Sequence, residues 1–133
     1  MLPAPDDTQE LIVRTDFSDD DLWRDFCERA EIEIDLEVIF HDDPKLNGAT
    51  RSELLKLMPP DFDGSALYVV DATTFSNDER SVGVFGLWDH LGKDFRAALN
   101  NVNSISANVQ IGNMGYQEFS NAVDADNVLR RFT

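Results

Sequence analysis

The chain has 133 residues, 42% of them hydrophobic and including nine Phe and two Trp, which is enough apolar material for the core of one domain. Its formal charge of −15 argues against direct binding to nucleic acid or to anionic membrane surfaces, because phosphate groups would repel it. Residues 1–45 carry 15 Asp and Glu against 4 Lys and Arg, so the acidity is concentrated in the N-terminal third.

The sequence indicates a cytoplasmic protein. The N-terminus has neither the basic nor the apolar region of a signal peptide, and no apolar run reaches the length of a membrane helix. The single Cys27 cannot form an internal disulfide. We expect one domain over residues 1–133, with residues 1–9 as an extended lead-in.

A buried strand followed by a capped helix is predicted near the N-terminus. The strand covers residues 10–17, and its continuous apolar run is typical of a strand covered on both faces. Ser18 and Asp21 fit the N-cap and N3 positions of a capping box. A stripe of apolar residues then carries the helix to about residues 29–31: Leu22, Trp23, Phe26, Cys27 and Ala30.

Alternation of apolar and acidic residues over 31–40, broken only at Ile39, predicts a half-exposed strand near an edge of the sheet. A second capping box, Thr50 with Glu53, opens a short helix over 51–58. The most apolar strand, 66–70, delivers Asp71 at its end. The polar segment 72–81 has room for one helical turn.

The sequence pattern is less regular in the last third of the chain. Residues 82–88 form a buried strand, residues 95–99 fit either a strand or the start of a helix, and the alternation over 105–111 predicts a last edge strand. Gly115 with Glu118 opens a final helix, after which three apolar residues dock the C-terminus: Val128, Leu129 and Phe132. Helices alternating with strands predict an α/β sandwich of two or three layers, with a largely parallel sheet of about five strands, mixed at its edge, and three main helices.

Four segments taken together resemble a small domain family of unknown function found in short bacterial proteins. They are LIVRTDFSDDDLW, HDDP, LYVVDATTF and IGNMGYQEFSNAVDADNVLRRF. The similarity covers residues 2–132 and implies a complete single domain, without implying an activity. The chain departs from the family at Gly115, where relatives tend to carry an acid, and this weakens the expected cap of the last helix.

A ligand site is conceivable where the strands end. In doubly wound sheets, ligands bind beyond the carboxyl ends of strands where the strand order reverses, and an order 2-1-3-4 would place that crevice between Asp16 and Asp71. With Asp89 nearby, these carboxylates could hold Mg²⁺, loosely as in a phospho-receiver domain, although no Lys follows a convincing fifth strand. The simpler interpretation is that Asp16 and Asp71 cap turns and helices. We predict no cofactor.

Other chemistry finds little support. His41 and His90 each neighbour acids, but a zinc site needs three or four converging ligands. Cys27 lies on the inward stripe of its helix without a visible base, so we assign it to the core. The serines lack a nucleophile-elbow context, and the glycines form no phosphate-binding loop.

The leading interpretation is a non-enzymatic protein-binding module, such as an inhibitor, an immunity-type protein or an accessory protein, that docks on a basic partner surface. Complementary charge speeds encounter and selects partners. The alternative is a small enzyme or ligand-binding domain at Asp16 and Asp71. The oligomeric state is left open. The expected partner-binding residues are Asp19, Asp20, Asp21, Asp25, Glu28, Glu33, Asp35 and Glu37.

Overall fold

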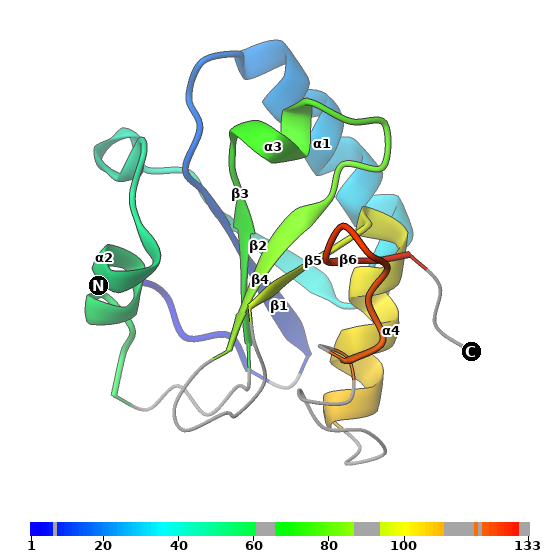
Figure 1. Cartoon of the computed structure of the whole chain (residues 1–133). Helices are drawn as coiled ribbons and strands as arrows, with labels where there is room; N and C mark the ends of the chain where they lie inside the picture. Colours follow the sequence, from blue (N-terminus) through cyan, green and yellow to red (C-terminus); the bar gives the residue numbers. More distant parts are fainter. Residues whose placement is uncertain (7, 61–65, 87–93, 111–118, 120, 131–133) are drawn as a thin grey trace.

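A mixed β-sheet forms the centre of the molecule (Figure 1). The computed structural model describes residues 1–6, 8–60, 66–86, 94–110, 119 and 121–130, with the backbone only for 106–110. Within these residues the sheet has six strands in the order β2-β1-β3-β4-β5-β6. The strands are β1 (Gln9–Arg14), β2 (Glu37–His41), β3 (Ala66–Val70), β4 (Val82–Gly86), β5 (Phe95–Ala97) and β6 (Val128–Leu129).

The α/β class is confirmed, but the sheet is mixed rather than largely parallel. β1 is parallel to β2 and β3, and β5 is parallel to β6, whereas β4 is antiparallel to both of its neighbours. The segment between β3 and β4 explains the reversal. It contains only the short helix α3 (Ala72–Phe75), and a parallel crossover needs a longer connection.

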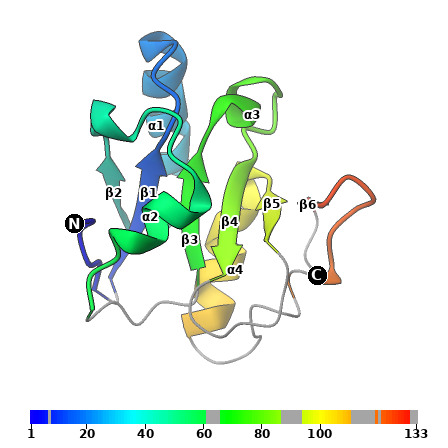
Figure 2. The ribbon, with the colours of Figure 1, turned by 60° about the vertical axis from the view of Figure 1, so that its left-hand side comes forward.

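Helices cover both faces of the sheet, so the sandwich has three layers over β1 and β3 (Figure 2). α1 (Asp20–Glu33) and α4 (Leu99–Gln110) lie against one face and contact each other. The 3-10 turn η1 (Pro44–Leu46) and α2 (Arg51–Lys56) lie against the other. No helix in the described part of the chain is long and apolar enough to cross a membrane.

The larger of the two apolar clusters lies under α1 and α4. Phe26 and Ile12 are fully buried in it, and Trp23 is only 6% exposed. The ring of Trp23 stacks on Phe26 at 5.8 Å and meets Phe40 edge-on at 5.7 Å, measured between ring centroids. These contacts hold α1 against β1 and β2 with its remaining sides exposed.

α1 begins one residue later than predicted. The N-cap is Asp19, whose carboxylate accepts hydrogen bonds from the N–H groups of Asp21 and Leu22 at 3.0 and 3.1 Å. Ser18 does not cap the helix, because its own N–H donates to the carboxylate of Asp16 in the preceding turn. The cap formed by Asp19 therefore takes the place of the predicted capping box of Ser18 and Asp21.

The predicted strand over 31–40 is wrong in its first half. α1 continues to Glu33, and the strand is confined to β2. Helical pairing persists to the end, where the Ile34 N–H donates to the Ala30 carbonyl at 2.9 Å. Ile32, expected to face the core, is 81% exposed. The strand is at an edge of the sheet, as predicted.

The predicted edge strand over 105–111 is also wrong, since residues up to Gln110 belong to α4. Leu99, Val102 and Ile105 recur at helical spacing and are each at most 1% exposed, so burial of this stripe outweighs the period-two pattern. The ambiguous segment contains both elements, with β5 ending at Ala97 and α4 starting at Leu99.

The remaining predicted elements are present where the structure describes them, but β1 ends at Arg14 rather than at residue 17 and α2 ends at Lys56 rather than at residue 58. Thr50 and Glu53 form the capping box of α2, β3 has its expected limits, and one helical turn follows it. β4 begins at Val82 as predicted and ends at Gly86. The predicted helix cap at Gly115 and Glu118, and the expected sites Asp89 and His90, lie outside the described residues.

Candidate functional site

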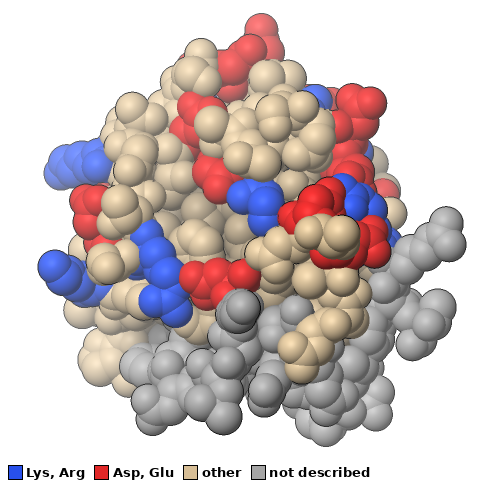
Figure 3. All heavy atoms as spheres, viewed as in Figure 1, with Lys and Arg blue, Asp and Glu red and all other residues tan. Residues whose placement is uncertain are grey.

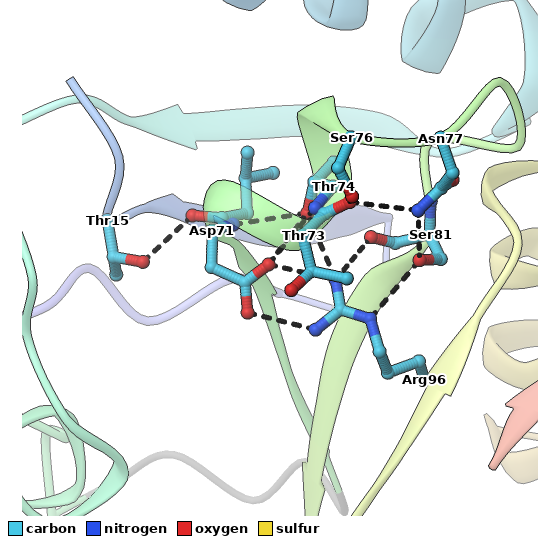
Figure 4. Close-up of polar contacts among 9 residues, drawn as sticks. Thr15, Asp71, Thr73, Thr74, Ser76, Asn77, Ser81 and Arg96 are labelled. Carbon is cyan, nitrogen blue, oxygen red and sulfur yellow. Dashed lines mark hydrogen bonds and ion pairs between the residues drawn. The ribbon is translucent and has the colours of Figure 1, made fainter. Parts of the chain in front are cut away.

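Asp16 and Asp71 follow neighbouring strands, so the strand order assumed for the predicted crevice is correct. Thr15 joins the two strand ends: its backbone N–H and its Oγ1 both donate to the Val70 carbonyl, at 2.7 and 2.9 Å (Figure 4). The carboxyl ends of β1 and β3 are therefore held together by direct hydrogen bonds within the protein.

Both carboxylate oxygens of Asp71 have protein partners. Arg96, from β5, donates one N–H to each of them at 2.9 Å (Figure 4). Asp71 also caps α3 by accepting from the N–H and hydroxyl of Thr74, both at 3.2 Å. Burial by itself would raise the pKa of Asp71, but the hydrogen bonds and charge of Arg96 and the Thr74 contacts outweigh it, so the pKa is lowered.

Arg96 extends the same network to β4. Its Nε donates to the Ser81 hydroxyl at 3.1 Å, and its Nη2 donates to the Ser81 carbonyl at 2.6 Å. Asn77 donates from its amide to the same hydroxyl at 3.2 Å. The network therefore ties the end of β3, the helical turn α3, the start of β4 and the middle of β5 into one unit.

A second arginine, Arg14, organises the end of β1. Its side chain is only 3% exposed, and its guanidinium donates to the Asp16 carbonyl, to Asp20 at 2.8 Å and to Asp42 at 3.3 Å. The same group lies 4.2 Å from the centre of the Phe17 ring. Because Asp20 starts α1 and Asp42 follows β2, Arg14 connects three segments by charge.

These contacts give the strand ends a structural role. Asp71 is held by Arg96 and Thr74, and the carboxylate of Asp16 accepts from the Ser18 N–H. The part of the chain that the structure describes contains no group of three His, Cys, Asp or Glu placed to hold a metal ion. The geometry thus favours the capping interpretation of Asp16 and Asp71 over the magnesium site.

The eight acids expected to bind a partner are all exposed, and we call them the acidic surface. Five have partners within the protein. Asp19 caps α1, and the other four form the pairs Asp20–Arg14, Asp21–Arg24, Asp35–Asn103 and Glu37–Gln9. The other three have no hydrogen-bond or ion-pair partner among the described residues: Asp25, Glu28 and Glu33.

Charge is unevenly distributed over the two helical layers. The segment 19–37 holds nine Asp and Glu against two Arg. The opposite layer, formed by η1 and α2, carries Lys45, Arg51 and Lys56 against Glu53 alone. Figure 3 shows basic side chains on the left of the molecule and acidic groups at the top, in the middle and on the right. Among the described residues, the segment 19–37 is therefore acidic, whereas η1 and α2 carry more basic than acidic side chains.

A pocket of about 260 Å³ opens beside the C-terminal end of α1. On its wall, Arg130 is bound by the carboxylates of Glu79, Asp124 and Asp126 at 2.5 to 3.1 Å. Hydrogen bonds to Asp126, Glu79 and Asp124 raise the pKa of Arg130 further. Its positive charge is thus offset within the protein. The pocket is lined by Arg29, Glu33, Asp78, Glu79, Ala98, Leu99, Asn100 and Arg130.

Cys27 is half-buried and packs against the larger apolar cluster, close to the predicted core position. Burial, followed by the nearby charges of Asp42 and Glu31, raises the pKa of the thiol to about 12. The thiolate is the reactive form of cysteine, so this environment disfavours nucleophilic chemistry at neutral pH.

Sequence reasoning missed Arg14 and Arg96. Arg14 closes the apolar run of β1 within a few residues of several acids, and this was a readable signal for an ion pair. Arg96 had no such signal, because its partner is 25 residues away in the chain. Arg96 neutralises Asp71, which was considered as a ligand group, whereas Arg14 pairs with Asp20 and Asp42 and binds only the backbone carbonyl of Asp16.

Comparison with known proteins gives one family. Residues 9–132 match the model of a domain of unknown function, DUF6924. No curated protein matches the sequence.

Proposed function

Because the chain belongs to the DUF6924 family of domains of unknown function, we propose its role from its own residues. We propose that it is a non-enzymatic protein-binding module whose acidic surface docks on a basic surface of another protein. The observation that carries the proposal is that three exposed carboxylates of the acidic surface, Asp25, Glu28 and Glu33, have no hydrogen-bond or ion-pair partner among the described residues. Such groups are free to pair with cations on a partner and to steer its approach.

Solubility alone accounts less well for this arrangement. A high net charge keeps a small protein soluble wherever the charges lie. In this chain the acids are concentrated on 19–37, while the η1 and α2 layer carries more basic than acidic residues. Segregated charge of this kind orients a partner as it approaches. The role is that of an inhibitor, an immunity-type protein or an accessory protein, acting in the cytoplasm.

The test compares two double variants of equal net charge. Asp25→Asn with Glu28→Gln removes two negative charges from the acidic surface, and Ser52→Lys with Asn121→Lys adds two positive charges at exposed positions elsewhere. A partner is first isolated with the wild-type protein, and its association rate constant is then measured at low and at physiological ionic strength. We expect the first variant to associate about three- to tenfold more slowly at low salt, and the second to stay close to wild type.

Equal association rates for the two variants would overturn the proposal, since net charge rather than the acidic surface would then govern encounter. A wild-type rate that does not depend on salt would also contradict it, because charge steering is screened by ions.

The alternative function, a small enzyme or ligand-binding domain at Asp16 and Asp71, has less support because both carboxylates are engaged within the protein. A magnesium titration followed by melting temperature tests it. If magnesium raises the melting temperature of the wild-type protein but not that of Asp71→Asn, the result would favour the alternative.

A further inference from the structure

The two edges of the sheet differ in what they offer to another chain. The edge strand β6 has only two residues, Val128 and Leu129, which is too short to guide strand pairing. The other edge strand, β2, has five residues, and the side chains of its central part are partly buried against the apolar clusters. Open edges of this kind are templates for pairing unless they are short, covered or interrupted by proline. Figure 2 shows β2 at the margin of the sheet, beside β1.

The register shows which backbone groups of β2 are available. The Glu37 N–H donates to the Thr8 carbonyl at 3.1 Å, on the β1 side. Because successive residues of a strand direct their backbone groups to opposite sides, those of Val38 and Phe40 are directed to the open side. Among the described residues, neither has a hydrogen-bond partner outside the sheet. Two N–H and two C=O groups are thus available for pairing.

The charges around β2 indicate which kind of chain could pair with this edge. Asp35 and Glu37 stand at its start and Asp42 and Asp43 follow its end, with no Lys or Arg between them. A second copy of this chain would bring the same acids alongside and be repelled. A basic segment would instead find carboxylates at both ends of the edge.

We propose that β2 binds an extended, basic segment of a partner protein as an additional strand of the sheet. This inference rests on the proposed function and adds the form of recognition to it. Backbone hydrogen bonds from Val38 and Phe40 supply pairing, while the flanking acids supply the preference for Lys and Arg.

The probe is a capped peptide about six residues long in which Lys and Val alternate, a length that matches an ordinary strand. One matched peptide has every backbone amide N-methylated, which retains the positive charges and removes all N–H donors. Another replaces each Lys by Glu. Binding is followed by amide chemical shifts and by hydrogen exchange of Val38 and Phe40.

We expect the Lys-Val peptide to give saturable shifts along β2 and to slow exchange of the Val38 and Phe40 amides about tenfold near saturation. The Glu peptide should not bind. Equal binding of the N-methylated peptide, with no slowing of exchange, would overturn strand addition and leave charge-driven docking intact. The absence of any saturable shift with the Lys-Val peptide would overturn strand addition and count against a basic partner on this side.

A variant pair checks the same point from the protein. Val38→Pro removes an outward N–H without removing a bond to β1, and Val38→Ala loses similar packing while keeping that N–H. We expect peptide affinity to fall at least about tenfold for the proline variant relative to the alanine variant. Equal affinities would contradict the proposal.

Discussion

The guanidinium of Arg96 and the carboxylate of Asp71 form a two-point ion pair, with both N–O distances at 2.9 Å. Their side chains are 20% and 35% exposed, so the pair is partly shielded from water. Paired donors and acceptors of this geometry are stronger than single hydrogen bonds. We interpret Asp71 as a structural residue on this basis.

Replacing Asp71→Asn tests that interpretation through pH. Asparagine retains the capping oxygen and loses the charge, so we expect a loss of about 1–2 kcal/mol in the free energy of unfolding at neutral pH. The folded-state pKa of Asp71 is lowered, so its contribution is complete above the unfolded-state value and is lost as the pH falls through the folded-state value.

Urea unfolding at neutral pH and below about pH 4 measures the free energy of unfolding of both proteins. The difference in this free energy between wild type and Asp71→Asn should shrink in acid. Arg96→Met supplies the control, because burial is then no longer offset by the arginine, so the loss of stability caused by Asp71→Asn at neutral pH should become smaller or reverse. A difference that is independent of pH would show that the pair contributes no charge interaction.

At the residue scale, Asp16 and Asp71 follow adjacent strands, as the assumed order 2-1-3-4 required. A ligand-binding role for these residues stays a prediction. The surroundings of Asp71 depend on Arg96, whose side chain reaches it from β5, whereas the carboxylate of Asp16 accepts from the nearby Ser18 N–H. A carboxylate without a visible partner in sequence can be paired by a cation from any other element.

At the scale of elements, the start of α1 depends on one side chain. Asp19 accepts two backbone N–H groups of the first turn, whereas Ser18 lies in the preceding turn and its N–H binds Asp16. Sequence analysis selected Ser18 because its spacing to Asp21 fits a capping box. The adjacent Asp19 is an equally good N-cap residue by type. Only the path of the turn between β1 and α1 distinguishes them.

We therefore expect Asp19→Ala to lower the free energy of unfolding by about 1 kcal/mol, through loss of the cap. Ser18→Ala serves as the matched control and should change it by less than about 0.5 kcal/mol, as for an exposed surface substitution. Chemical denaturation of both variants gives the comparison. A larger loss for Ser18→Ala would place the cap at the residue first predicted.

The misassigned elements share a cause. Alternation over 31–40 and over 105–111 suggested strands, but in both segments a helix takes residues from the pattern. In α4, Leu99, Val102 and Ile105 form the stripe that becomes buried, and they begin before the alternating stretch. Short period-two patterns are ambiguous when neighbouring residues also satisfy helical spacing.

At the scale of the whole molecule, Asp25 and Glu28 of α1 add to the negative charge of the isolated protein. Asp25 and Glu28 lie on the same side of the helix in a chain whose net charge is −15, and they have no ion-pair partner among the described residues. Self-repulsion destabilises a compact, highly charged protein.

The Asp25→Asn and Glu28→Gln double variant should accordingly be as stable as wild type or more stable, by up to about 0.5 kcal/mol at low salt. Thermal unfolding at low and high ionic strength checks this, and the gain should disappear in high salt because screening removes the repulsion. A clear destabilisation would assign these acids a structural role and weaken the proposed function.

By itself the sequence determined the α/β class, the cap of α2, the limits of β3, the edge position of β2 and the concentration of acid on 19–37. These depend on local periodicity, local capping and composition. Tertiary structure alone decided the antiparallel placement of β4, the helical state of 99–110 and the pairing of Asp71 with Arg96. Each of these depends on contacts between residues distant in the chain, where burial and charge pairing outweigh local pattern.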